Sequence, residues 1–352
     1  MTATQPRVLV ITNMGPKPSS PFQGNFVRAQ VTALQAQGLQ PAYHYMRWHR
    51  DSWLNRLLKY PVFFLDFCRR FLFSRQGYQI LHVHFFYPTI WLALVYRWLR
   101  NPQAKIVVTC HGSDIYHYQP PGRLYRWCAR QVDSWIFSSE ALAQQFFMQP
   151  ERAQVLAAGI DNRYASATWH SKADKDIDLL YVGTLDQNKG MDRLLAMLPQ
   201  LQAWRVVIAG SGPWQVALAQ ATAAYPNITL LGPQSGADLL ALYQRARCFI
   251  SLSRKESFGL VMAEAMACYT PVVATDTDGA RAQIRQGVTG YAVSQQDEAL
   301  CQRQLLAAIR QLLALDETAY RQLQQQGRMQ AEQILLPVIV NKLCKHYQEL
   351  ML

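Results

Sequence analysis

Apolar runs of strand length alternate with segments of helical periodicity from residue 7 onward. RVLVIT (7–12) is a continuous apolar run, NMGPKPSSPFQG (13–24) is rich in Gly, Pro and Ser, and residues 25–39 have helical periodicity and stop at Gly38. Strand, loop and helix in this order begin a Rossmann-like unit. The loop is longer than most strand-to-helix connections, which suggests a role, although a tolerated surface loop is the alternative.

The alternation continues through both halves of the chain. In the first half, strand-like runs occupy 80–88, the start of 105–116, 134–139 and 155–161, and an apolar helix covers 88–100. In the second half, strands are expected within 178–190, 204–214 and 228–232, and helices at 237–246 and, with one proline, at 331–352. This pattern predicts two α/β domains. Residues 162–176 are polar and aperiodic, so we expect the linker between the domains there.

The segment 245–291 carries the strongest chemical signal. It predicts a strand at 248–252, a tight loop, a helix at about 258–268 and a second strand at 271–274. Glu256 lies in the loop and Glu264 lies in the helix, roughly 8–9 Å further along its axis. Because a helix N-terminus is a natural anion site, two carboxylates at this spacing could meet the two ends of a phosphate-centred ligand.

Length and composition exclude several classes of protein. A chain of 352 residues suits two domains rather than one core. No secretory signal is evident, and the apolar run around Phe85 to Tyr96 is shorter than the ~20 residues of a spanning helix, so we expect a cytoplasmic protein. The seven cysteines are scattered and form no CxxC pair, which argues against a zinc site or a disulfide framework.

The net charge of +12 is concentrated in the first half: residues 1–165 hold 18 Lys/Arg and 7 Asp/Glu, whereas residues 166–352 hold 17 and 16. Within that half, residues 46–75 interleave bases with aromatic and aliphatic side chains, a pattern typical of interfacial membrane helices. The alternative is a pair of amphipathic helices on the sheet whose bases face water. The bases expected on this membrane or acceptor face are Arg47, Arg50, Arg56, Lys59, Arg69 and Arg70. No nucleic-acid-binding motif is visible.

Three histidines follow or end strands in the first half. His82 and His84 share one face of a strand and could mimic a metal pair, but no third ligand is evident, so buried, hydrogen-bonded histidines are favoured. His111 lies at the carboxyl end of a strand and is followed by Gly112, which allows a close approach by a ligand. His111 is therefore the better candidate for a functional residue.

Together these motifs resemble the retaining glycosyltransferases of the GT-B fold, family 4 in particular. The matching segments are YVGTLDQNKG, VIAGSGP, ITLLG, LLALYQRARCFISLS, ESFGLVMAEAMACYTPVVA and GVTGYAV in the second half, and GNFVRAQVTALQAQG, HVH, HGSD and VLAAGID in the first. The most specific is the Glu–seven residues–Glu pattern in ESFGLVMAE. The resemblance implies two Rossmann-like domains facing each other across a cleft: an acceptor-binding domain at 1–165, a donor-binding domain at 166–334, and a last helix, about 335–352, that packs back on the first.

The resemblance also implies roles for particular residues. Glu256 would lie by the donor sugar, Glu264 would bind the nucleotide ribose, and Lys189 would pair with the diphosphate. Main-chain N–H groups of Ser257, Phe258 and Gly259 would contact the sugar or the phosphates.

The strand-end Gly183 belongs to the same donor site by resemblance. From the first domain, His111 would lie near the reacting carbon of the sugar and the loop containing Gly15 would cover the diphosphate. No metal or other cofactor is expected.

Four positions depart from the family pattern. Thr184 stands where an arginine is common, which removes a bidentate phosphate donor. Three alternatives stay open: Lys189 suffices, Arg254 or Lys255 compensates, or the donor pyrophosphate is held more weakly. The other departures are Tyr269 and Asp278, each in place of a glycine, and Ala282 in place of a glutamate.

The expected activity is transfer of a sugar, with retained configuration, from a nucleotide diphosphate sugar to a lipid-linked or anionic glycan in cell-envelope polysaccharide synthesis. The expected location is the inner face of the cell membrane, with peripheral attachment. Two alternatives stay open: a sugar-nucleotide-processing enzyme such as an epimerase on the same fold, and a non-enzymatic membrane- or polyanion-binding module with a degenerate donor site.

Overall fold

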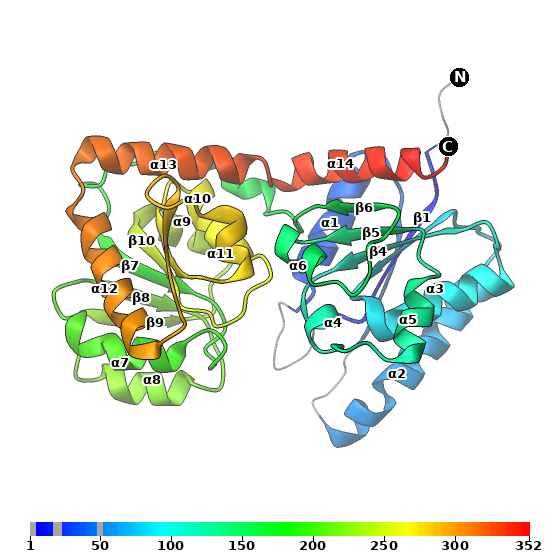
Figure 1. Cartoon of the computed structure of the whole chain (residues 1–352), viewed down its shortest axis with the longest axis horizontal. Helices are drawn as coiled ribbons and strands as arrows, with labels where there is room; N and C mark the ends of the chain where they lie inside the picture. Colours follow the sequence, from blue (N-terminus) through cyan, green and yellow to red (C-terminus); the bar gives the residue numbers. More distant parts are fainter. Residues whose placement is uncertain (1–4, 17–22, 48–51) are drawn as a thin grey trace. The chain divides into compact units, whose positions relative to one another are not determined.

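The structure is a computed structural model that describes residues 5–16, 23–47 and 52–352 (Figure 1). The chain divides into two compact units. Unit 1 contains Met1–Gly159 and Leu336–Leu352, and unit 2 contains Ile160–Leu335. Each unit has its own parallel sheet with helices on its faces.

Unit 1 is built on a six-stranded parallel sheet of order β2-β1-β3-β4-β5-β6. Its strands are β1 (Val8–Thr12), β2 (Ala42–Tyr45), β3 (Ile80–His84), β4 (Lys105–Cys110), β5 (Ser134–Phe137) and β6 (Ala153–Val155). Its helices are α1 (Asn25–Ala36), α2 (Trp53–Phe67), α3 (Phe86–Leu99), α4 (Ser113–Tyr116), α5 (Arg123–Ala129), α6 (Glu140–Gln144) and α14 (Leu336–Glu349). β1 and β3 are buried at every position, as expected for strands covered on both faces.

Helices cover both faces of this sheet. Side chains of α2, α3 and α5 form one core with alternate strand residues such as Leu9 and Leu81. On the opposite face, α1 packs against α14, and Tyr347 of α14 donates or accepts a hydrogen bond of 2.6 Å with the buried His82 Nδ1. His346 of α14 lies 2.9 Å from the Ser134 hydroxyl. The last helix of the chain is therefore part of unit 1.

Two expectations for unit 1 are wrong. Residues 155–161 do not form a strand, because β6 ends at Val155 and Gly159 takes a left-handed φ of 88°. The described part of residues 46–75 contains one long helix rather than a pair: α2 continues directly into a single π-helical turn, η1 (Cys68–Leu72). Pro61 lies inside α2 on its exposed side and does not end it.

Unit 2 repeats the architecture with the sheet order β12-β11-β10-β7-β8-β9. Its strands are β7 (Ile177–Val182), β8 (Val206–Ala209), β9 (Ile228–Gly232), β10 (Ala246–Ser251), β11 (Val272–Thr275) and β12 (Gly290–Val293). Its helices are η2 (Asn162–Ser166), α7 (Met191–Met197), η3 (Leu198–Gln200), α8 (Gln215–Thr222), α9 (Gly236–Arg245), α10 (Leu260–Ala267), α11 (Asp278–Gln283), α12 (Glu298–Ala314) and α13 (Glu317–Glu332). The expected fold class, two Rossmann-like α/β domains, is confirmed.

The polar segment 162–176 is packed onto unit 2 rather than standing apart from it. Tyr164 is buried in the core of that unit, and Arg328 of α13 donates hydrogen bonds to the carbonyls of Tyr164 and Ala165 at 2.8 and 2.9 Å. Lys175 is only 1% exposed, and its ammonium donates to the Gln244 carbonyl at 2.7 Å. The buried Arg328 and Lys175 therefore attach the segment 162–176 to unit 2 by hydrogen bonds to main-chain carbonyls, although its sequence has no apolar periodicity.

The tail of the chain is two helices rather than one. α13 ends at Glu332 and α14 begins at Leu336. The residues between them still belong to unit 2, where the Ile160 N–H donates to the Ile334 carbonyl at 3.0 Å. Pro337 is accommodated because it lies in the first turn of α14, where its missing N–H has no helical partner to lose. No helix within the described residues is long and apolar enough to cross a bilayer.

Replacing Tyr347 with Phe removes the hydroxyl that pairs with the buried His82 Nδ1. We expect unit 1 to lose about 1–3 kcal/mol of stability, the cost of leaving a buried polar group unpaired. Hydrogen exchange should show the loss in the amides of unit 1. Tyr320→Phe is the matched control, because its hydroxyl donates to the Arg247 carbonyl at 2.7 Å in unit 2, and it should loosen unit 2 instead. Equal protection of unit 1 in Tyr347→Phe and in the wild type would contradict the prediction.

Candidate functional site

The strand orders place one reversal of direction in each sheet. In unit 2, β7 lies between β10 and β8, so the chain builds outward from β7 in both directions. In open parallel sheets, ligands bind at the carboxyl ends of the two strands that flank this reversal. The loops that follow β7 and β10 are residues 183–190 and 252–259. They contain Gly183, Lys189, Glu256 and the expected main-chain donors.

These two loops touch at main-chain distance. A Cβ atom on Gly190 would lie 2.2 Å from the Leu252 carbonyl oxygen, and Gly190 also has a φ of 75°. The neighbouring loop after β8 packs in the same way, since a Cβ on Gly210 would lie 1.9 Å from the Gly183 carbonyl oxygen. Only glycine fits at both places. Gly210 and Gly212 therefore serve loop packing here, and the partial dinucleotide fingerprint has a structural explanation.

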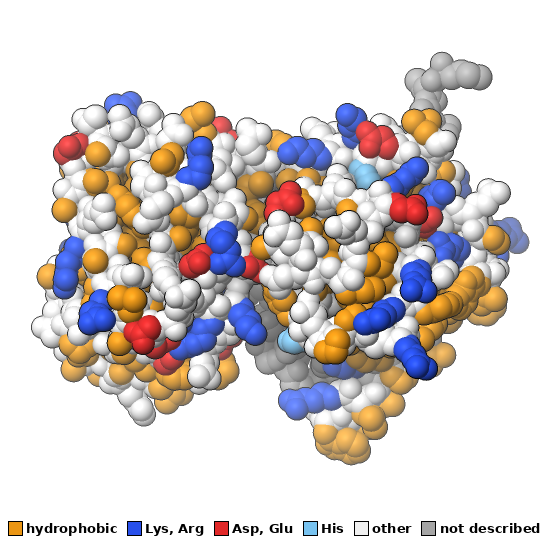
Figure 2. All heavy atoms as spheres, in the orientation of Figure 1, with side chains coloured by type: hydrophobic (Ala, Val, Ile, Leu, Met, Phe, Trp, Pro, Cys, Tyr) orange, Lys and Arg blue, Asp and Glu red, His pale blue; other side chains and the backbone are white. Residues whose placement is uncertain are grey.

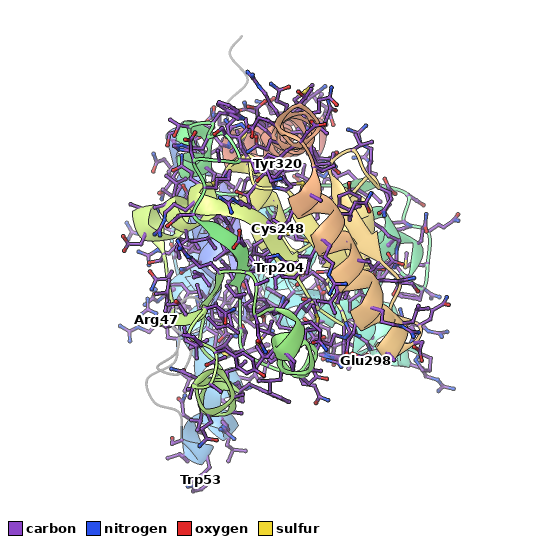
Figure 3. All side chains as sticks on the ribbon, turned by 90° about the vertical axis from the view of Figure 1, so that its left-hand side faces the viewer. Arg47, Trp53, Trp204, Cys248, Glu298 and Tyr320 are labelled. Atoms are coloured by element: carbon purple, nitrogen blue, oxygen red, sulfur yellow. The ribbon has the colours of Figure 1, made fainter. Side chains whose placement is uncertain are left out.

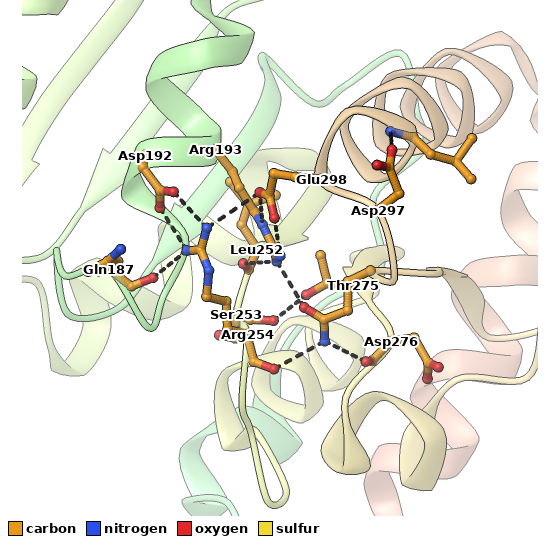
Figure 4. Close-up of polar contacts among 12 residues, drawn as sticks. Gln187, Asp192, Arg193, Leu252, Ser253, Arg254, Thr275, Asp276, Asp297 and Glu298 are labelled. Carbon is orange, nitrogen blue, oxygen red and sulfur yellow. Dashed lines mark hydrogen bonds and ion pairs between the residues drawn. The ribbon is translucent and has the colours of Figure 1, made fainter.

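Arg254 fastens the two loops together (Figure 4). Its guanidinium donates to both carboxylate oxygens of Asp192, at 2.7 and 2.6 Å, and to the Gln187 carbonyl at 2.6 Å. The adjacent Arg193, only 2% exposed, forms two hydrogen bonds with Glu298 and donates to the Leu252 carbonyl at 3.1 Å. With its guanidinium committed to Asp192, Arg254 is a structural residue and does not replace the arginine missing at Thr184.

Lys189 and Glu256 meet where the two loops converge. The Lys189 ammonium and the Glu256 carboxylate form a partly buried ion pair. The Lys189 N–H donates to the Asp186 carboxylate at 2.8 Å, and Gly190, the next residue, is the N-cap of α7. The stem of Glu256 lies against Gly259, where a Cβ would come within 2.9 Å of the Glu256 Cγ. A lysine and a carboxylate are thus fixed side by side at the reversal point of the sheet.

The main chain from Glu256 to Gly259 is anchored by α11. Gly279 N–H donates to the Glu256 carbonyl at 2.7 Å, and the Gln283 side chain donates to the Phe258 carbonyl. Gly259, with a φ of 77°, is the N-cap of α10. The segment Ser257–Gly259 therefore leads into the N-terminus of a helix with the Phe258 and Gly259 carbonyls already engaged, which suits N–H groups that face an anion.

Glu264 is the fifth residue of α10 and follows both residues of the ion pair in the sequence. The Tyr243 hydroxyl donates to its Oε2 at 2.9 Å, and Tyr164 also forms a hydrogen bond with it. Burial raises the pKa of Glu264 to about 7, although both tyrosine hydrogen bonds act to lower it. At neutral pH this carboxyl exchanges readily between acceptor and donor, which suits binding to hydroxyl groups.

The other departures from the family pattern have local explanations. Thr184 is exposed, and its carbonyl accepts a hydrogen bond from the Tyr181 hydroxyl at 2.9 Å. Tyr269 follows α10 with a φ of 55°, a left-handed conformation that glycine adopts without strain. Asp278 begins α11 and pairs with Arg281 at 2.5 Å, while Ala282 is exposed on the same helix. Lys255 is exposed, so it and Lys189 are the lysines of the two loops that an anion can reach.

In unit 1 the reversal lies between β1 and β3. Gly15 follows β1, is buried, and could not carry a Cβ, which would lie 2.0 Å from the Met46 carbonyl oxygen. Residues 17–22 of the same loop lie outside the described residues. His84 ends β3, and His111 follows the adjacent strand β4. Gly15, His84 and His111 therefore all lie at the carboxyl edge of this sheet.

His84 contacts His111 directly. The His84 Nδ1 lies 3.0 Å from the His111 Nε2, and the rings are nearly parallel, at 14°. Burial lowers the pKa of His111 to about 3 and that of His84 well below its ordinary value of 6.5. The buried Asp114 carboxylate accepts the His111 N–H at 3.0 Å and fixes its main chain. Both imidazoles are therefore neutral at physiological pH, and sequence reasoning that favoured a buried His84 missed its contact with His111.

The neutral state allows a choice between tautomers. The His84 Nε2 is buried and has no hydrogen-bond partner. A buried N–H without an acceptor costs more than an unused lone pair. His84 should therefore carry its proton on Nδ1 and donate it to the His111 Nε2, which leaves the neutral His111 with its proton on Nδ1.

The basic residues expected on the membrane or acceptor face are distributed around α2. Arg47, Arg56, Arg69 and Arg70 are exposed, and Lys59 is partly exposed. Arg70 pairs with Asp66 at 2.9 Å. Arg50 lies outside the described residues. Trp53 projects from the start of α2 at the far end of unit 1 from its sheet (Figure 3).

Sequence reasoning did not find Tyr164, Tyr243 or Gln283 as part of this arrangement. Each lies on a different element from the residue it supports: Tyr243 on α9, Tyr164 in η2 and Gln283 on α11. No local spacing links them to Glu264 or Phe258. Within the described residues, no group of three or more His, Cys, Asp and Glu side chains is arranged to hold a metal ion.

Comparison with known families assigns both halves of the chain. Residues 7–163 match the family described as Glycosyltransferase Family 4, and residues 167–330 match the family described as Glycosyl transferases group 1. The two matches meet near the division between the units and together cover nearly the whole chain.

Curated relatives are similar to this chain in sequence, and solved structures share its fold. The D-inositol 3-phosphate glycosyltransferase of Mycolicibacterium paratuberculosis is 30% identical over 253 residues, which are 62% of this chain and 56% of the relative. The chain thus spans about half the length of the curated relatives it matches. Sucrose-phosphate synthase from Thermosynechococcus elongatus has the same fold, with a TM-score of 0.76 at 20% identity over 98% of this chain and 99% of that one. Anabaena HepE, solved with UDP and glucose, also has this fold. Its TM-score is 0.71 at 15% identity, over 97% of this chain and 100% of that one.

Replacing Glu264 with Gln tests the raised pKa of this carboxyl. In the wild type, the unfolded chain ionises Glu264 near pH 4.5 while the folded protein retains the proton to about pH 7. Stability from this group is therefore lost as the pH rises from about 4.5 through 7. We expect the thermal unfolding temperature of the wild type to fall relative to that of Glu264→Gln as the pH rises from 5 to 8. Glu332→Gln, which removes the half-exposed carboxylate that pairs with Arg328 on α13, should run parallel to the wild type. Parallel curves for Glu264→Gln would contradict the prediction.

Replacing His84 tests the tautomer of His111. Nitrogen-15 NMR of histidine-labelled protein should show the neutral His111 protonated on Nδ1. We expect His84→Phe to lose this preference because the donor to the His111 Nε2 is gone, whereas His84→Asn, whose amide can donate from nearly the same place, should retain it. The exposed His117→Asn is the matched control. Protonation of His111 on Nε2 in the wild type would overturn the assignment.

Proposed function

The chain belongs to the glycosyltransferases of the GT-B fold, and we propose that it transfers a sugar, with retained configuration, from a nucleotide diphosphate sugar to a hydroxyl group of a lipid-linked or anionic glycan. The observation that carries the proposal is the Lys189–Glu256 ion pair at the reversal point of the unit 2 sheet. It lies beside a helix N-terminus and is followed by a second carboxyl, Glu264, on that helix. In this arrangement Lys189 suits an anion, Glu256 suits a sugar and Glu264 suits the hydroxyl groups of a ribose.

In this proposal each end of the donor has its own residues. Glu264, with Tyr243 beside it, binds the ribose hydroxyls. Lys189 and the N–H groups of Ser257–Gly259 hold the diphosphate, where the dipole of α10 adds to the attraction. Gly183 lets the main chain after β7 approach the donor. Glu256 then lies on the side of the sugar.

Transfer breaks the bond between the anomeric carbon and the diphosphate oxygen and forms a bond from that carbon to the acceptor oxygen. The departing nucleoside diphosphate takes the electron pair, and its phosphate oxygen accepts the proton that the acceptor hydroxyl releases. Negative charge grows on the departing diphosphate, so fixed positive groups stabilise the transition state more than the bound donor. Lys189 and the helix N-terminus supply that charge in the proposal, without a metal ion. Glu256 stabilises the positive character that develops on the sugar ring.

Unit 1 contributes two groups to the proposal. His111, neutral and protonated on Nδ1, donates a hydrogen bond to the sugar rather than transferring a proton at neutral pH. The loop containing Gly15 covers the diphosphate. These roles follow from the family resemblance and from the neutral state of the histidine.

The comparisons suggest which substrates to test first. HepE has been solved with UDP-glucose, which supports a uridine nucleotide sugar as a starting point for the donor. The curated relatives are named for inositol 3-phosphate, and an acceptor with a phosphate group agrees with the basic first half of this chain. Cell-envelope polysaccharide synthesis would supply such lipid-linked or anionic acceptors.

We further propose that α2 makes peripheral contact with the inner face of the cell membrane. Its outer stripe carries exposed apolar side chains, among them Trp53 at 76% and Leu57 at 67%, and exposed bases flank it. An amphipathic helix with this composition is attracted by anionic headgroups and buries its apolar stripe between them. The contact would bring the enzyme to a lipid-linked acceptor.

Glu256→Gln should reduce sugar transfer on the order of a hundredfold, because it removes the charge beside the sugar while keeping the shape of the side chain. The assay follows release of nucleoside diphosphate and the glycosylated product with and without acceptor. Product that forms only with acceptor distinguishes transfer from epimerisation. Glu332→Gln is the control, since it removes a half-exposed carboxylate of the same unit that pairs with Arg328 rather than with Lys189. Transfer at the wild-type rate by Glu256→Gln would remove this residue from the mechanism, and a wild type that processes no nucleotide sugar would favour a binding module.

Vesicle co-sedimentation should detect the membrane contact. We expect more protein to pellet with vesicles of mixed phosphatidylcholine and phosphatidylglycerol than with phosphatidylcholine alone. Leu57→Ser with Leu65→Ser, both exposed on α2, should weaken binding about tenfold or more through lost apolar burial. Val216→Ser on α8 of unit 2, 68% exposed, is the matched control. Equal pelleting with neutral and anionic vesicles would exclude the electrostatic part of the proposal.

A further inference from the structure

Exposed apolar side chains of unit 1 are concentrated on one helical layer. Of the 14 large hydrophobic residues exposed among the described part of unit 1, 11 lie on α2, α3, α5 or the turn after η1. They are Trp53, Leu54, Leu57, Leu58, Val62, Leu65, Phe73, Trp98, Leu99, Leu124 and Trp127. We propose that the outer face of this whole layer, rather than α2 alone, docks on an anionic lipid bilayer, with Trp98 and Trp127 as a second anchor.

The second anchor is a cluster of three tryptophans. The Trp127 ring of α5 lies 5.8 Å from that of Trp91 and 5.9 Å from that of Trp98, both on α3. Trp91 is partly buried against the core, whereas Trp98 is 50% and Trp127 41% exposed. Leu124, one helical turn before Trp127, is 51% exposed and extends the cluster. Tryptophan side chains favour the headgroup region of a bilayer because they combine a large apolar ring with a polar N–H group.

The cluster is continuous with the α2 surface. Arg100, at the end of α3, donates a hydrogen bond of 2.5 Å to the Ser74 carbonyl, which follows η1. Phe73, the residue before Ser74, is 84% exposed, and Leu99, the residue before Arg100, is 68% exposed. Phe73 and Leu99 therefore bridge the exposed stripe of α2 and the tryptophan cluster.

The charge of the layer fits an anionic surface. Residues 53–75, 86–100 and 123–130 together hold ten Lys/Arg and one Asp/Glu, Asp66. Asp66 is paired with Arg70, and Arg97 is paired with Asp133 outside the layer. Arg123, Arg126 and Arg130 of α5 are exposed around Leu124 and Trp127. Figure 2 shows hydrophobic side chains gathered at the lower right of unit 1 with Lys and Arg along their border.

A bilayer explains both features better than an ordinary solvated face does. The inner side of the layer already forms the core with the sheet, so the outer apolar side chains are not needed for folding. A second apolar face on the same helices requires a partner. Long basic side chains beside Trp and Leu can reach phosphates while their stems lie among the acyl chains. Two anchors at different positions on one continuous surface would fix the orientation of unit 1 on the membrane, which a single helix lying in the interface would not.

The test depends on the membrane contact proposed for α2 but can be read separately from it. Trp98→Ser with Trp127→Ser removes the second anchor and leaves α2 unchanged. We expect this variant to bind phosphatidylcholine–phosphatidylglycerol vesicles about tenfold more weakly than the wild type. Combined with Leu57→Ser and Leu65→Ser, it should abolish binding. Val216→Ser with Met329→Ser, both exposed in unit 2, is the matched control.

Insertion of the cluster can be observed directly. In the variant Trp48→Phe with Trp53→Phe, the tryptophan that begins α2 and the one shortly before it in the sequence are absent, so quenching by brominated phospholipids reports on the remaining ones. We expect quenching that disappears when Trp98 and Trp127 are also replaced with Phe. Wild-type vesicle affinity together with unquenched fluorescence would overturn the second anchor while leaving the α2 contact intact.

A second copy of the chain is the competing occupant. If the layer is a protein interface, the wild type will be a dimer in light scattering without lipid, and Trp98→Ser with Trp127→Ser will be a monomer. That result would overturn the proposal, whereas a monomeric wild type that binds anionic vesicles supports it. Nucleotide-sugar turnover in solution should be the same in this variant and the wild type, so a failure of the catalytic proposal is seen separately as absent turnover in both.

Discussion

The proposed donor site in unit 2 depends on main-chain contact between the loops after β7 and β10. Gly190 lies against the Leu252 carbonyl at a distance that excludes any Cβ atom, and Arg254 joins the two loops through Asp192. Lys189 precedes Gly190, and Glu256 lies two residues after Arg254. The backbone contact between the loops therefore determines the geometry of the Lys189–Glu256 ion pair. A site whose charged groups are positioned in this way loses little by reorganisation when charge develops on a ligand.

In unit 1, burial and hydrogen bonds determine the protonation of the polar groups at the sheet edge. Its histidines at the sheet edge are neutral because an imidazolium would lose its hydration there, and hydrogen bonds then decide where each proton lies. His82 is satisfied on both nitrogens, by Thr109 at 2.7 Å and by Tyr347 from the far end of the chain. The C-terminal helix thus completes the polar interior behind His84 and His111, which explains why it belongs to unit 1.

The helices of unit 1 meet two different demands. On α2, Phe63 and Phe67 face the sheet and form the core, whereas Leu57 and Leu65 on the opposite side remain exposed. The same division applies to α3 and α5. Apolar side chains on the outer side do not stabilise the isolated fold, and the basic residues among them select an anionic environment. In the two proposals above, sugar transfer and membrane contact use different parts of unit 1.

The sequence by itself determined the two α/β series, the main strands and the Glu256–Glu264 spacing, because buried parallel strands are continuous apolar runs and a helix fixes distance along its axis. It did not determine that α2 is one helix, that α13 and α14 are separate, or that 155–161 is not a strand, since apolar periodicity is the same in each alternative. Only the tertiary structure decided that Arg254 is held by Asp192, that Tyr243 supports Glu264 and that His84 contacts His111. These partners lie on different elements, so no local pattern records them; they meet because parallel strands end at one edge of a sheet.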